Sequence, residues 1–224
     1  MKLFLSDLHL GSPLFKYKKE LMDLVQNSDV DEIYILGDLF DVWEDSLENI
    51  IEEYKEFFDY LNDTDKFVVI LTGNHDPSAE EMRNYLDVLV VSQLEIELFG
   101  KKTLLIHGDK FDTATTIWKW WHKLWFPIHY VGQRAGFNFK KVMRNLIHTY
   151  RMGKKGKDYN DFVLNSEEKI YENYKEDFDI VVCGHTHLNK FIVAPGLTYI
   201  NTGSLMDTST YLVCDNNACT FGEI

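Results

Sequence analysis

Long apolar runs are missing from this chain of 224 residues. No stretch of about 18 apolar residues occurs, so the sequence predicts no membrane-spanning helix. The amino terminus starts with the strand-like Lys2–Leu5 and lacks the apolar region of a signal peptide, and we therefore expect a cytoplasmic protein. Wholesale disorder is excluded, because 45% of the residues are hydrophobic and 26% are charged, as in ordinary globular proteins.

Cysteine is scarce, with three residues in the whole chain. Cys183 lies inside an apolar run, where a small buried hydrophobic side chain is expected. Cys214 and Cys219 can be neighbours across a terminal hairpin, but the number of cysteines is odd and no CxxC pair occurs. We therefore expect no structural disulfide, in agreement with a cytoplasmic location.

Acidic side chains are absent from Thr113–Lys157, although the whole chain has a formal net charge of −13. This segment holds ten Lys or Arg residues and four of the five tryptophans. An acidic body with one basic, aromatic insertion predicts that the insertion meets an anionic, partly apolar partner. The acidic remainder argues against a long nucleic acid as a partner, because it would repel a polyanion.

Strands and helices alternate in the first part of the chain, which indicates parallel strands joined by crossover helices. The expected strands there cover 2–6, 32–36 and 66–72, and the expected helices cover 14–26, 47–61 (opened by Ser46) and 78–86, where Ser78 and Glu81 form a capping box. Further strands are expected at 88–91, 94–99, 102–107, 178–183, 190–194, 197–201, 209–214 and 218–222. Helices are expected at 113–126, 129–152 and 158–174, with a link at 153–157. We predict an α/β fold of two packed sheets with helices outside, forming a single domain over 1–224 with a helical insertion, or lid, at about 113–157.

Side chains typical of metal ligands follow five of these strands. The clusters are Asp7-Leu8-His9, Gly37-Asp38, Gly73-Asn74-His75-Asp76, His107-Gly108-Asp109 and Gly184-His185-Thr186-His187. Open α/β sheets place their chemistry at the carboxyl ends of the strands, so the pattern predicts an enzyme with its site at that edge.

Seven residues make up the predicted metal site: Asp7, His9, Asp38, Asn74, His107, His185 and His187. Carboxylate, imidazole and amide ligands together suit borderline divalent ions, with Mn²⁺ as our first expectation and Fe²⁺ or Zn²⁺ as alternatives. Seven ligands are too many for one tetrahedral ion, but they suit two ions that share a bridging carboxylate. For Asp76 and Asp109 two interpretations stay open, as supporting partners of the ligands or as turn residues.

These blocks resemble the calcineurin-like metallophosphoesterase superfamily, whose signature is D-x-H, G-D-x-x-D, G-N-H-D/E, a single His and G-H-x-H, in this order. The resemblance implies a two-metal phosphodiester or pyrophosphate hydrolase that uses a metal-bridging hydroxide. By matching position, the first ion is held by Asp7, His9, Asp38 and His187, and the second by Asn74, His107, His185 and the bridging Asp38. The same match places His75 at the leaving oxygen as proton donor or transition-state stabiliser, oriented by Asp41.

Within the superfamily the chain resembles UDP-2,3-diacylglucosamine diphosphatases and their relatives. The likeness is carried by Ser6–Gly11, Gly37–Trp43 and His107–Asp112, followed by the basic helical insertion. It implies a nucleotide- or lipid-linked substrate such as a UDP-acyl-sugar. The lipid A enzymes carry Arg directly after the metal-binding Asn, whereas this chain has His75, so the acyl-sugar nucleotide is left open as the substrate.

The insertion has two interpretations. Trp118, Trp121 and Trp125 recur at helical spacing beside Lys119 and Lys123, as in an interfacial helix that reaches lipid while its cations meet phosphate. This interpretation predicts peripheral membrane contact. The other interpretation is a pair of helices that only pack against each other and the domain.

Two functions compete with the leading hypothesis. One is a soluble phosphodiesterase or phosphoprotein phosphatase, which would turn over small or peptide substrates without an effect of detergent. The other is a scaffold that binds metal without catalysis. Such a scaffold usually lacks a ligand or the catalytic histidine, and none of these residues is missing here. The sequence leaves the oligomeric state open.

Overall fold

The computed structural model describes residues 1–27, 29–111 and 157–224. The helices predicted at 113–126 and 129–152, and the link before Lys157, lie outside the described residues. The chain divides into two compact units, one formed by Met1–Gly108 with Asn173–Ile224 and the other by Asp109–Glu172. A single domain with an insertion stays a prediction.

The first unit contains a six-stranded sheet in the order β11-β10-β1-β2-β3-β4. Strands β1, β2, β3 and β4 run parallel, β10 pairs antiparallel with β1, and β11 pairs antiparallel with β10. The bounds are β1 Lys2–Leu5, β2 Glu32–Leu36, β3 Phe67–Leu71, β4 Leu89–Val91, β10 Thr210–Cys214 and β11 Cys219–Glu223. The parallel strands β1, β2 and β3 therefore all end at the same edge.

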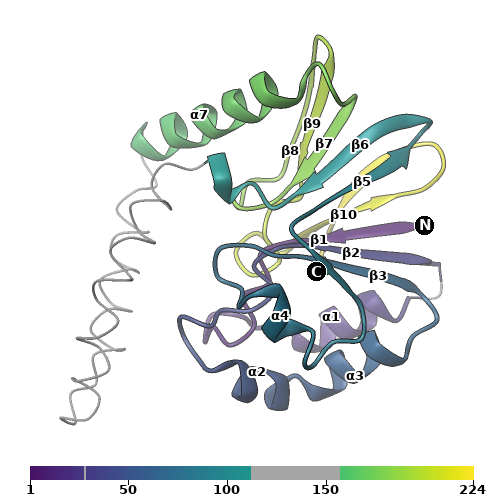
Figure 1. Ribbon diagram of the computed structural model, residues 1–224, viewed down its shortest axis with the longest axis vertical. Coiled ribbons are helices and arrows are strands. Elements are labelled where there is room, and N and C mark those ends of the chain that lie inside the picture. Colours follow the sequence, from purple (N-terminus) through teal and green to yellow (C-terminus); the bar gives the residue numbers. More distant parts are fainter. Residues whose placement is uncertain (28, 112–156) are drawn as a thin grey trace. The chain divides into compact units, whose positions relative to one another are not determined.

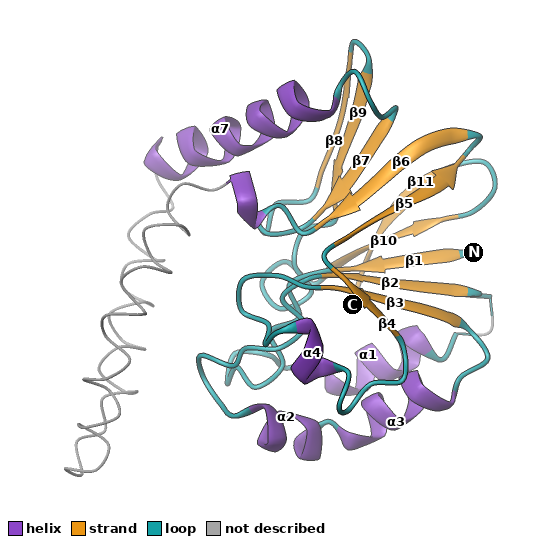
Figure 2. Cartoon of the chain, in the orientation of Figure 1, coloured by secondary structure: helices purple, strands orange, loops and turns teal. Residues whose placement is uncertain are grey.

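A five-stranded sheet in the order β5-β6-β7-β9-β8 completes the unit (Figure 2). β6, β7 and β9 are parallel, and the edge strands β5 and β8 are antiparallel to their neighbours. The bounds are β5 Gln93–Leu98, β6 Lys101–Ile106, β7 Ile180–Cys183, β8 Lys190–Ala194 and β9 Leu197–Asn201. These two mixed sheets with helices confirm the predicted α/β fold.

Strand alternation divides the apolar residues between two cores. Leu3 and Leu5 of β1 point to the side of the six-stranded sheet that the helices cover, where they join one buried cluster. Phe4 points the opposite way, into a second cluster with Leu105 of β6 and Val182 of β7. Figure 1 shows the covering helices together on that one face: α1 Lys18–Val25, α2 Leu47–Glu53, α3 Lys55–Asp63 and α4 Ala79–Met82.

The helix predicted over 47–61 is two helices, which is a correction. The backbone leaves helical geometry at Tyr54, where φ is −105° and ψ is 26°, and α3 starts directly after it. The Tyr54 carbonyl accepts hydrogen bonds from both Phe57 and Phe58, so the residue that closes α2 also opens α3. The apolar spacing continues through the break because both helices bury side chains against the same core.

Other boundaries differ by a few residues. α1 begins at Lys18 instead of near residue 14, and Leu14 is exposed. α4 ends at Met82, earlier than predicted, but its capping box between Ser78 and Glu81 is present. In the second unit, Asp109 begins a short 3-10 helix, η1 (Asp109–Phe111), and α7 (Lys157–Tyr174) follows the undescribed segment. Among the described residues we find no helix both long and apolar enough to cross a membrane.

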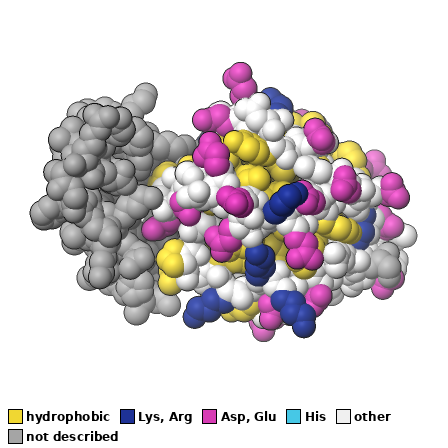
Figure 3. All heavy atoms as spheres, turned by 90° about the horizontal axis from the view of Figure 1, so that it is seen from below, with side chains coloured by type: hydrophobic (Ala, Val, Ile, Leu, Met, Phe, Trp, Pro, Cys, Tyr) yellow, Lys and Arg dark blue, Asp and Glu magenta, His cyan; other side chains and the backbone are white. Residues whose placement is uncertain are grey.

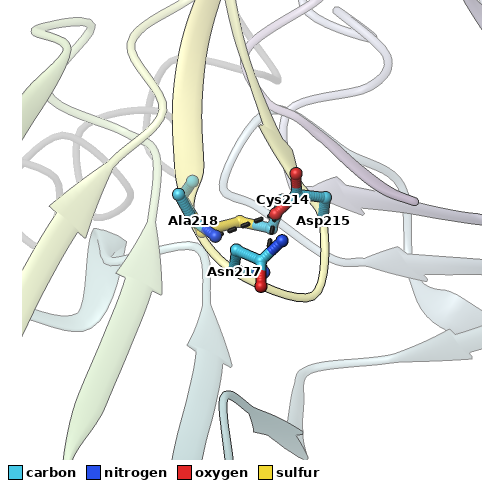
Figure 4. Close-up of a disulfide and its surroundings, with 5 residues drawn as sticks. Cys214, Asp215, Asn217 and Ala218 are labelled. Carbon is cyan, nitrogen blue, oxygen red and sulfur yellow. Dashed lines mark hydrogen bonds between the residues drawn. A yellow bond between two sulfur atoms is a disulfide. The ribbon is translucent and has the colours of Figure 1, made fainter.

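The cysteines show that the expectation of no disulfide was wrong. Cys214 and Cys219 face each other in the β10–β11 register and form a disulfide (Figure 4). Asp215 closes the turn between them, because its Oδ1 accepts hydrogen bonds from the backbone N–H groups of Asn217 and Ala218 at 2.7 and 2.8 Å. The third cysteine, Cys183, is buried, as its apolar run predicted, and is not part of a disulfide.

Candidate metal centre

The predicted ligands follow the carboxyl ends of five parallel strands of the first unit. Asp7 and His9 follow β1, Asp38 follows β2, Asn74 follows β3, His107 follows β6, and His185 with His187 follows β7. Strands β1, β2 and β3 belong to one sheet, and β6 and β7 to the other. The packing of two sheets therefore brings together side chains that are up to 180 positions apart in the chain.

The backbone of this region has an unusual conformation. Seven non-glycine residues of the described chain have positive φ, and five of them are predicted ligands. Their φ angles are 52° at Asp7, 50° at His9, 51° at Asp38, 70° at His185 and 57° at His187. Such left-handed residues cost about 1–3 kcal/mol each and tend to cluster at functional sites. The surrounding fold therefore holds these side chains in place at the expense of stability.

The first group of converging atoms comes from Asp7, His9 and His187, whose ligand atoms lie within 4.8 Å of one another. The Nε2 atoms of the two histidines are 3.4 Å apart, and Oδ1 of Asp7 lies 3.1 Å from Nε2 of His187. Two imidazole nitrogens and a carboxylate oxygen that face one another in this way suit a shared cation.

The second group comes from Asp38, His107 and His185. His107 is oriented by a hydrogen bond from Nδ1 to the carbonyl of Leu36 at 2.8 Å, which directs its Nε2 toward Asp38. That Nε2 lies 3.3 Å from Oδ2 of Asp38, and the same oxygen lies 3.8 Å from Nε2 of His9. Asp38 is therefore positioned between the two groups.

Asn74 supplies a test of whether this centre fits a metal ion. Its Oδ1 is buried and accepts no hydrogen bond within the described part of the chain. A buried polar oxygen is normally paired with a donor, and an amide oxygen is a suitable ligand for divalent ions. The residues present therefore fit a cation at this position.

Electrostatics favour ionised carboxylates here. Burial raises the pKa of Asp7, but the charges of His187 and His107 outweigh it and hold the pKa well below its usual range. Burial likewise raises the pKa of Asp38, and the charges of His107 and His75 lower it further than burial raises it. Buried carboxylates that keep their charge are ready to bind cations.

His187 is linked to a carboxylate that the sequence did not reveal. Its Nδ1 is hydrogen-bonded to Oδ2 of Asp207, while its Nε2 faces Asp7. Burial lowers the pKa of His187, but the charge of Asp7 and the hydrogen bond to Asp207 reverse this effect and raise the pKa to about 10. Metal-binding histidines are typically oriented by such a second carboxylate. Only the fold brings Asp207 here, 20 residues later in the chain, so no local signal pointed to it.

The predicted catalytic pair is in contact. Nδ1 of His75 lies 3.1 Å from Oδ1 of Asp41, and both side chains are buried. The other oxygen of Asp41 lies 3.4 Å from Nδ1 of His9, a contact that the sequence did not predict. Burial raises the pKa of Asp41, but the hydrogen bond from His75 and the charge of the nearby His9 reverse this and lower the pKa below its usual range. One carboxylate thus contacts a candidate ligand and the candidate proton donor together.

Asp76 supports the loops that carry the candidate ligands. Of its two interpretations in the sequence analysis, supporting partner or turn residue, the structure favours the first. Its carboxylate accepts hydrogen bonds from the backbone N–H groups of Asp38, Phe40 and Gly73, each at 2.8 Å. Burial and the charge of Asp38 raise the pKa of Asp76 to about 7. Asp76 therefore joins the loop after β2 to the loop after β3.

Two glycines leave room for the carboxylates. A Cβ atom at Gly73 would overlap the side chain and backbone of Asp38, and one at Gly184 would lie 2.6 Å from Oδ2 of Asp7. Real Cβ atoms essentially never approach so closely. The glycines that precede the predicted ligands are thus required by the close approach of neighbouring loops.

Comparisons with known proteins show the family of the chain and its similar sequences. The family model described as calcineurin-like phosphoesterase matches residues 3–189. A protein of Psychromonas ingrahamii named UDP-2,3-diacylglucosamine hydrolase is 27% identical over 198 residues, which cover 83% of this chain and 80% of that protein. A protein of the same name from Yersinia pseudotuberculosis is 26% identical over 205 residues, 83% of this chain and 81% of that protein.

Solved structures share the fold at low sequence identity. An archaeal phosphodiesterase superposes with a TM-score of 0.52 at 14% identity, covering 100% of this chain and 98% of that one. Yfce, a phosphoesterase from E. coli, gives a TM-score of 0.51 at 16% identity, covering 98% of this chain and 90% of that one. At these identities the likeness concerns the fold alone.

Proposed function

Because this chain belongs to the calcineurin-like phosphoesterase family, a family of metal-dependent hydrolases, we propose that it cleaves phosphodiester or pyrophosphate bonds with two divalent ions. Mn²⁺ is our first candidate, with Fe²⁺ and Zn²⁺ as alternatives. The observation that carries the proposal is the position of Asp38, whose Oδ2 lies 3.3 Å from His107 Nε2 and 3.8 Å from His9 Nε2. One carboxylate oxygen between two histidine groups suits a bridging ligand.

The ligands divide naturally between two ions. Asp7, His9 and His187 would hold the first, Asn74, His107 and His185 would hold the second, and Asp38 would serve both. Bound divalent cations supply a water-derived nucleophile at neutral pH and neutralise charge on the phosphoryl oxygens. The protein's own contribution is to fix these seven side chains and to keep Asp7 and Asp38 ionised.

His75 would donate a proton to the leaving oxygen. Its Nδ1 is held by Asp41 at 3.1 Å, which leaves Nε2 as the atom that can reach a substrate. Its backbone N–H donates to Oδ1 of Asp38 at 2.8 Å, so the proton donor and the proposed bridging ligand are fixed relative to each other. General acid catalysis of this kind contributes about 10²–10⁴-fold to the rate.

The test is metal content together with turnover, by the Mn²⁺-loaded protein, of phenyl methyl phosphate, whose phenoxide leaves poorly and therefore needs a proton donor. We expect two ions per chain, and His75→Ala should lose activity by about 10²-fold or more with its metal content unchanged. Asp38→Asn should bind fewer ions. A wild-type protein that saturates at one ion would refute the two-metal site, and a fully loaded protein that hydrolyses no phosphoester would favour the scaffold.

For the substrate we propose a nucleotide- or lipid-linked pyrophosphate such as a UDP-acyl-sugar. The support is the name shared by the two relatives above, UDP-2,3-diacylglucosamine hydrolase, over about four fifths of both chains. A screen of UDP- and CDP-linked lipids against cyclic nucleotides, with release of phosphate or nucleotide as the readout, tests this choice. Preferential turnover of the cyclic nucleotides would contradict it.

A soluble phosphodiesterase or phosphoprotein phosphatase is the second candidate. The observation in its favour is His75 directly after Asn74, where the lipid A enzymes carry Arg, together with its contact to Asp41. This candidate predicts turnover of small or peptide phosphoesters that detergent does not change. A strict requirement for a lipid-linked substrate would exclude it.

We also propose that the insertion at 113–157 contacts a membrane surface through its basic and aromatic residues. We expect the full chain to co-sediment with vesicles that contain anionic lipid, and to release from them at high salt. If the chain does not bind such vesicles, the membrane contact is refuted and the alternative, in which the insertion only packs against the domain, is favoured. A nucleic-acid partner is disfavoured, because the chain has a formal net charge of −13 and acidic side chains are spread over the face shown in Figure 3.

A further inference from the structure

An aromatic side chain lies directly against the proposed proton donor. The ring centroid of Trp43 is 3.8 Å from that of His75, and the two planes are inclined by 34°. His9 contacts the same imidazole from another direction, edge to face, with centroids 4.7 Å apart. Asp41 holds Nδ1. The imidazole is thus bounded by an indole, a second imidazole and a carboxylate.

The local backbone places Trp43 there. The N–H groups of Glu44 and Asp45 both donate to the carbonyl of Asp41, at 3.0 and 3.3 Å, which folds 41–45 into a turn. Val42 N–H donates to the carbonyl of His75 at 3.3 Å, so this turn is tied to the histidine through its main chain. Trp43 lies half-buried in this turn and is not among the candidate metal ligands.

We propose that Trp43 is a positioning residue that fixes the ring plane of His75, so that Nε2 points at the leaving oxygen. A single hydrogen bond at Nδ1 still allows the imidazole to tilt about the bond axis, and contact with the indole face removes that freedom. Proton transfer depends steeply on such alignment, because small misplacements at a reacting centre reduce rates strongly. The inference rests on the function proposed for His75.

The test compares two esters that differ in their need for a proton donor. We expect Trp43→Ala to lower kcat about tenfold on phenyl methyl phosphate, whose phenoxide leaves poorly, and by less than about threefold on p-nitrophenyl methyl phosphate. Trp43→Phe keeps an aromatic face and should stay near the wild type on both. Metal content should not change in either variant, because Trp43 supplies no ligand atom.

Two controls separate positioning from general damage. In a His75→Ala background, Trp43→Ala should have no further effect on either ester, because the residue acts only through the histidine. In the metal-free protein labelled at the histidine Cε1 positions, the His75 signal, assigned by its absence from His75→Gln, should move downfield in Trp43→Ala as the ring current of the indole is lost.

Three results would overturn the role of Trp43: equal loss on both esters, a further loss in the His75→Ala background, or loss of metal. An unmoved His75 signal would overturn the contact itself. A wild-type protein that turns over neither these esters nor any UDP- or CDP-linked lipid would instead refute the proposed function and remove the basis of the positioning role. The NMR readout needs neither metal nor turnover, so the two failures are distinguishable.

Discussion

Metal binding at pH 8 should release close to one proton from His187. The folded-state pKa of this residue is about 10, above the ordinary value of 6.5, because Asp7 and Asp207 stabilise its charged form. Protonated His187 therefore stabilises the metal-free fold. This stabilisation is complete below about pH 6.5 and is lost progressively as the pH rises through about 10. A metal ion needs the lone pair on Nε2, so it must displace this proton throughout that window.

The magnitude follows from the pKa. At pH 7, removing the proton from a group with a pKa of about 10 costs about 4 kcal/mol, from about 1.36 kcal/mol for each pH unit. The contribution of His187 alone should therefore make the apparent affinity for Mn²⁺ rise about tenfold per pH unit in this range. Nδ1 keeps its hydrogen bond to Asp207 in both states, so Nε2 is the site that loses the proton.

Isothermal titration of the metal-free protein with Mn²⁺ in buffers of different ionisation enthalpy measures this release directly. The dependence of the observed heat on buffer enthalpy gives the number of protons released, which should be larger by about one in the wild type than in His187→Gln. His187→Gln should remove that proton, and Asp207→Asn should reduce it because the pKa of His187 falls. Two results would refute the reasoning: observed heats that are the same in all buffers, or a His187→Gln variant that releases as many protons as the wild type.

Two further predictions concern the frame of the site and the terminal hairpin. Gly73→Ala should weaken Mn²⁺ binding by about 10–100-fold, because its Cβ would displace Asp38. Gly100→Ala is the control: its Cβ meets nothing within 4 Å, so it should bind Mn²⁺ normally, although its φ of +71° makes the substitution cost some stability. Equal titration curves for the two variants would contradict the close-approach argument. Replacing Cys214 and Cys219 by Ser should lower the free energy of unfolding by about 2 kcal/mol, from the entropy of closing a short loop. Chemical denaturation under oxidising conditions measures this loss, and an unchanged midpoint would show that the disulfide adds no stability.

The residues of the candidate site could be named from the sequence because residue types and strand ends are local features. Each candidate ligand lies within a few residues of the end of an apolar run, as Asp38 follows Ile33–Leu36 after one glycine, and the end of a strand is marked by the change from apolar to polar residues. The contact between His75 and Asp41 also came from the sequence, but through resemblance to a family and not through spacing. Asp7 and His9 do converge, but their φ angles of 52° and 50° are not those of an extended strand, so their two-residue spacing alone does not explain why they face the same group.

The contacts that depend on packing of distant segments could not be predicted. Asp207 reaches His187, and Asp41 reaches His9, because separate loops meet at the sheet edge, and no periodic pattern encodes such meetings. Two local features were missed for other reasons. The apolar spacing continues through the break at Tyr54, and the odd number of cysteines argued against the pair Cys214–Cys219 although the hairpin was expected.

The sequence by itself thus determined which atoms are available for metal and phosphate chemistry, since residue type and strand ends are local properties. The tertiary structure decided which of these atoms face one another and which carboxylates support them. It did so because close packing of two sheets fixes distances between chain segments that local preferences leave free.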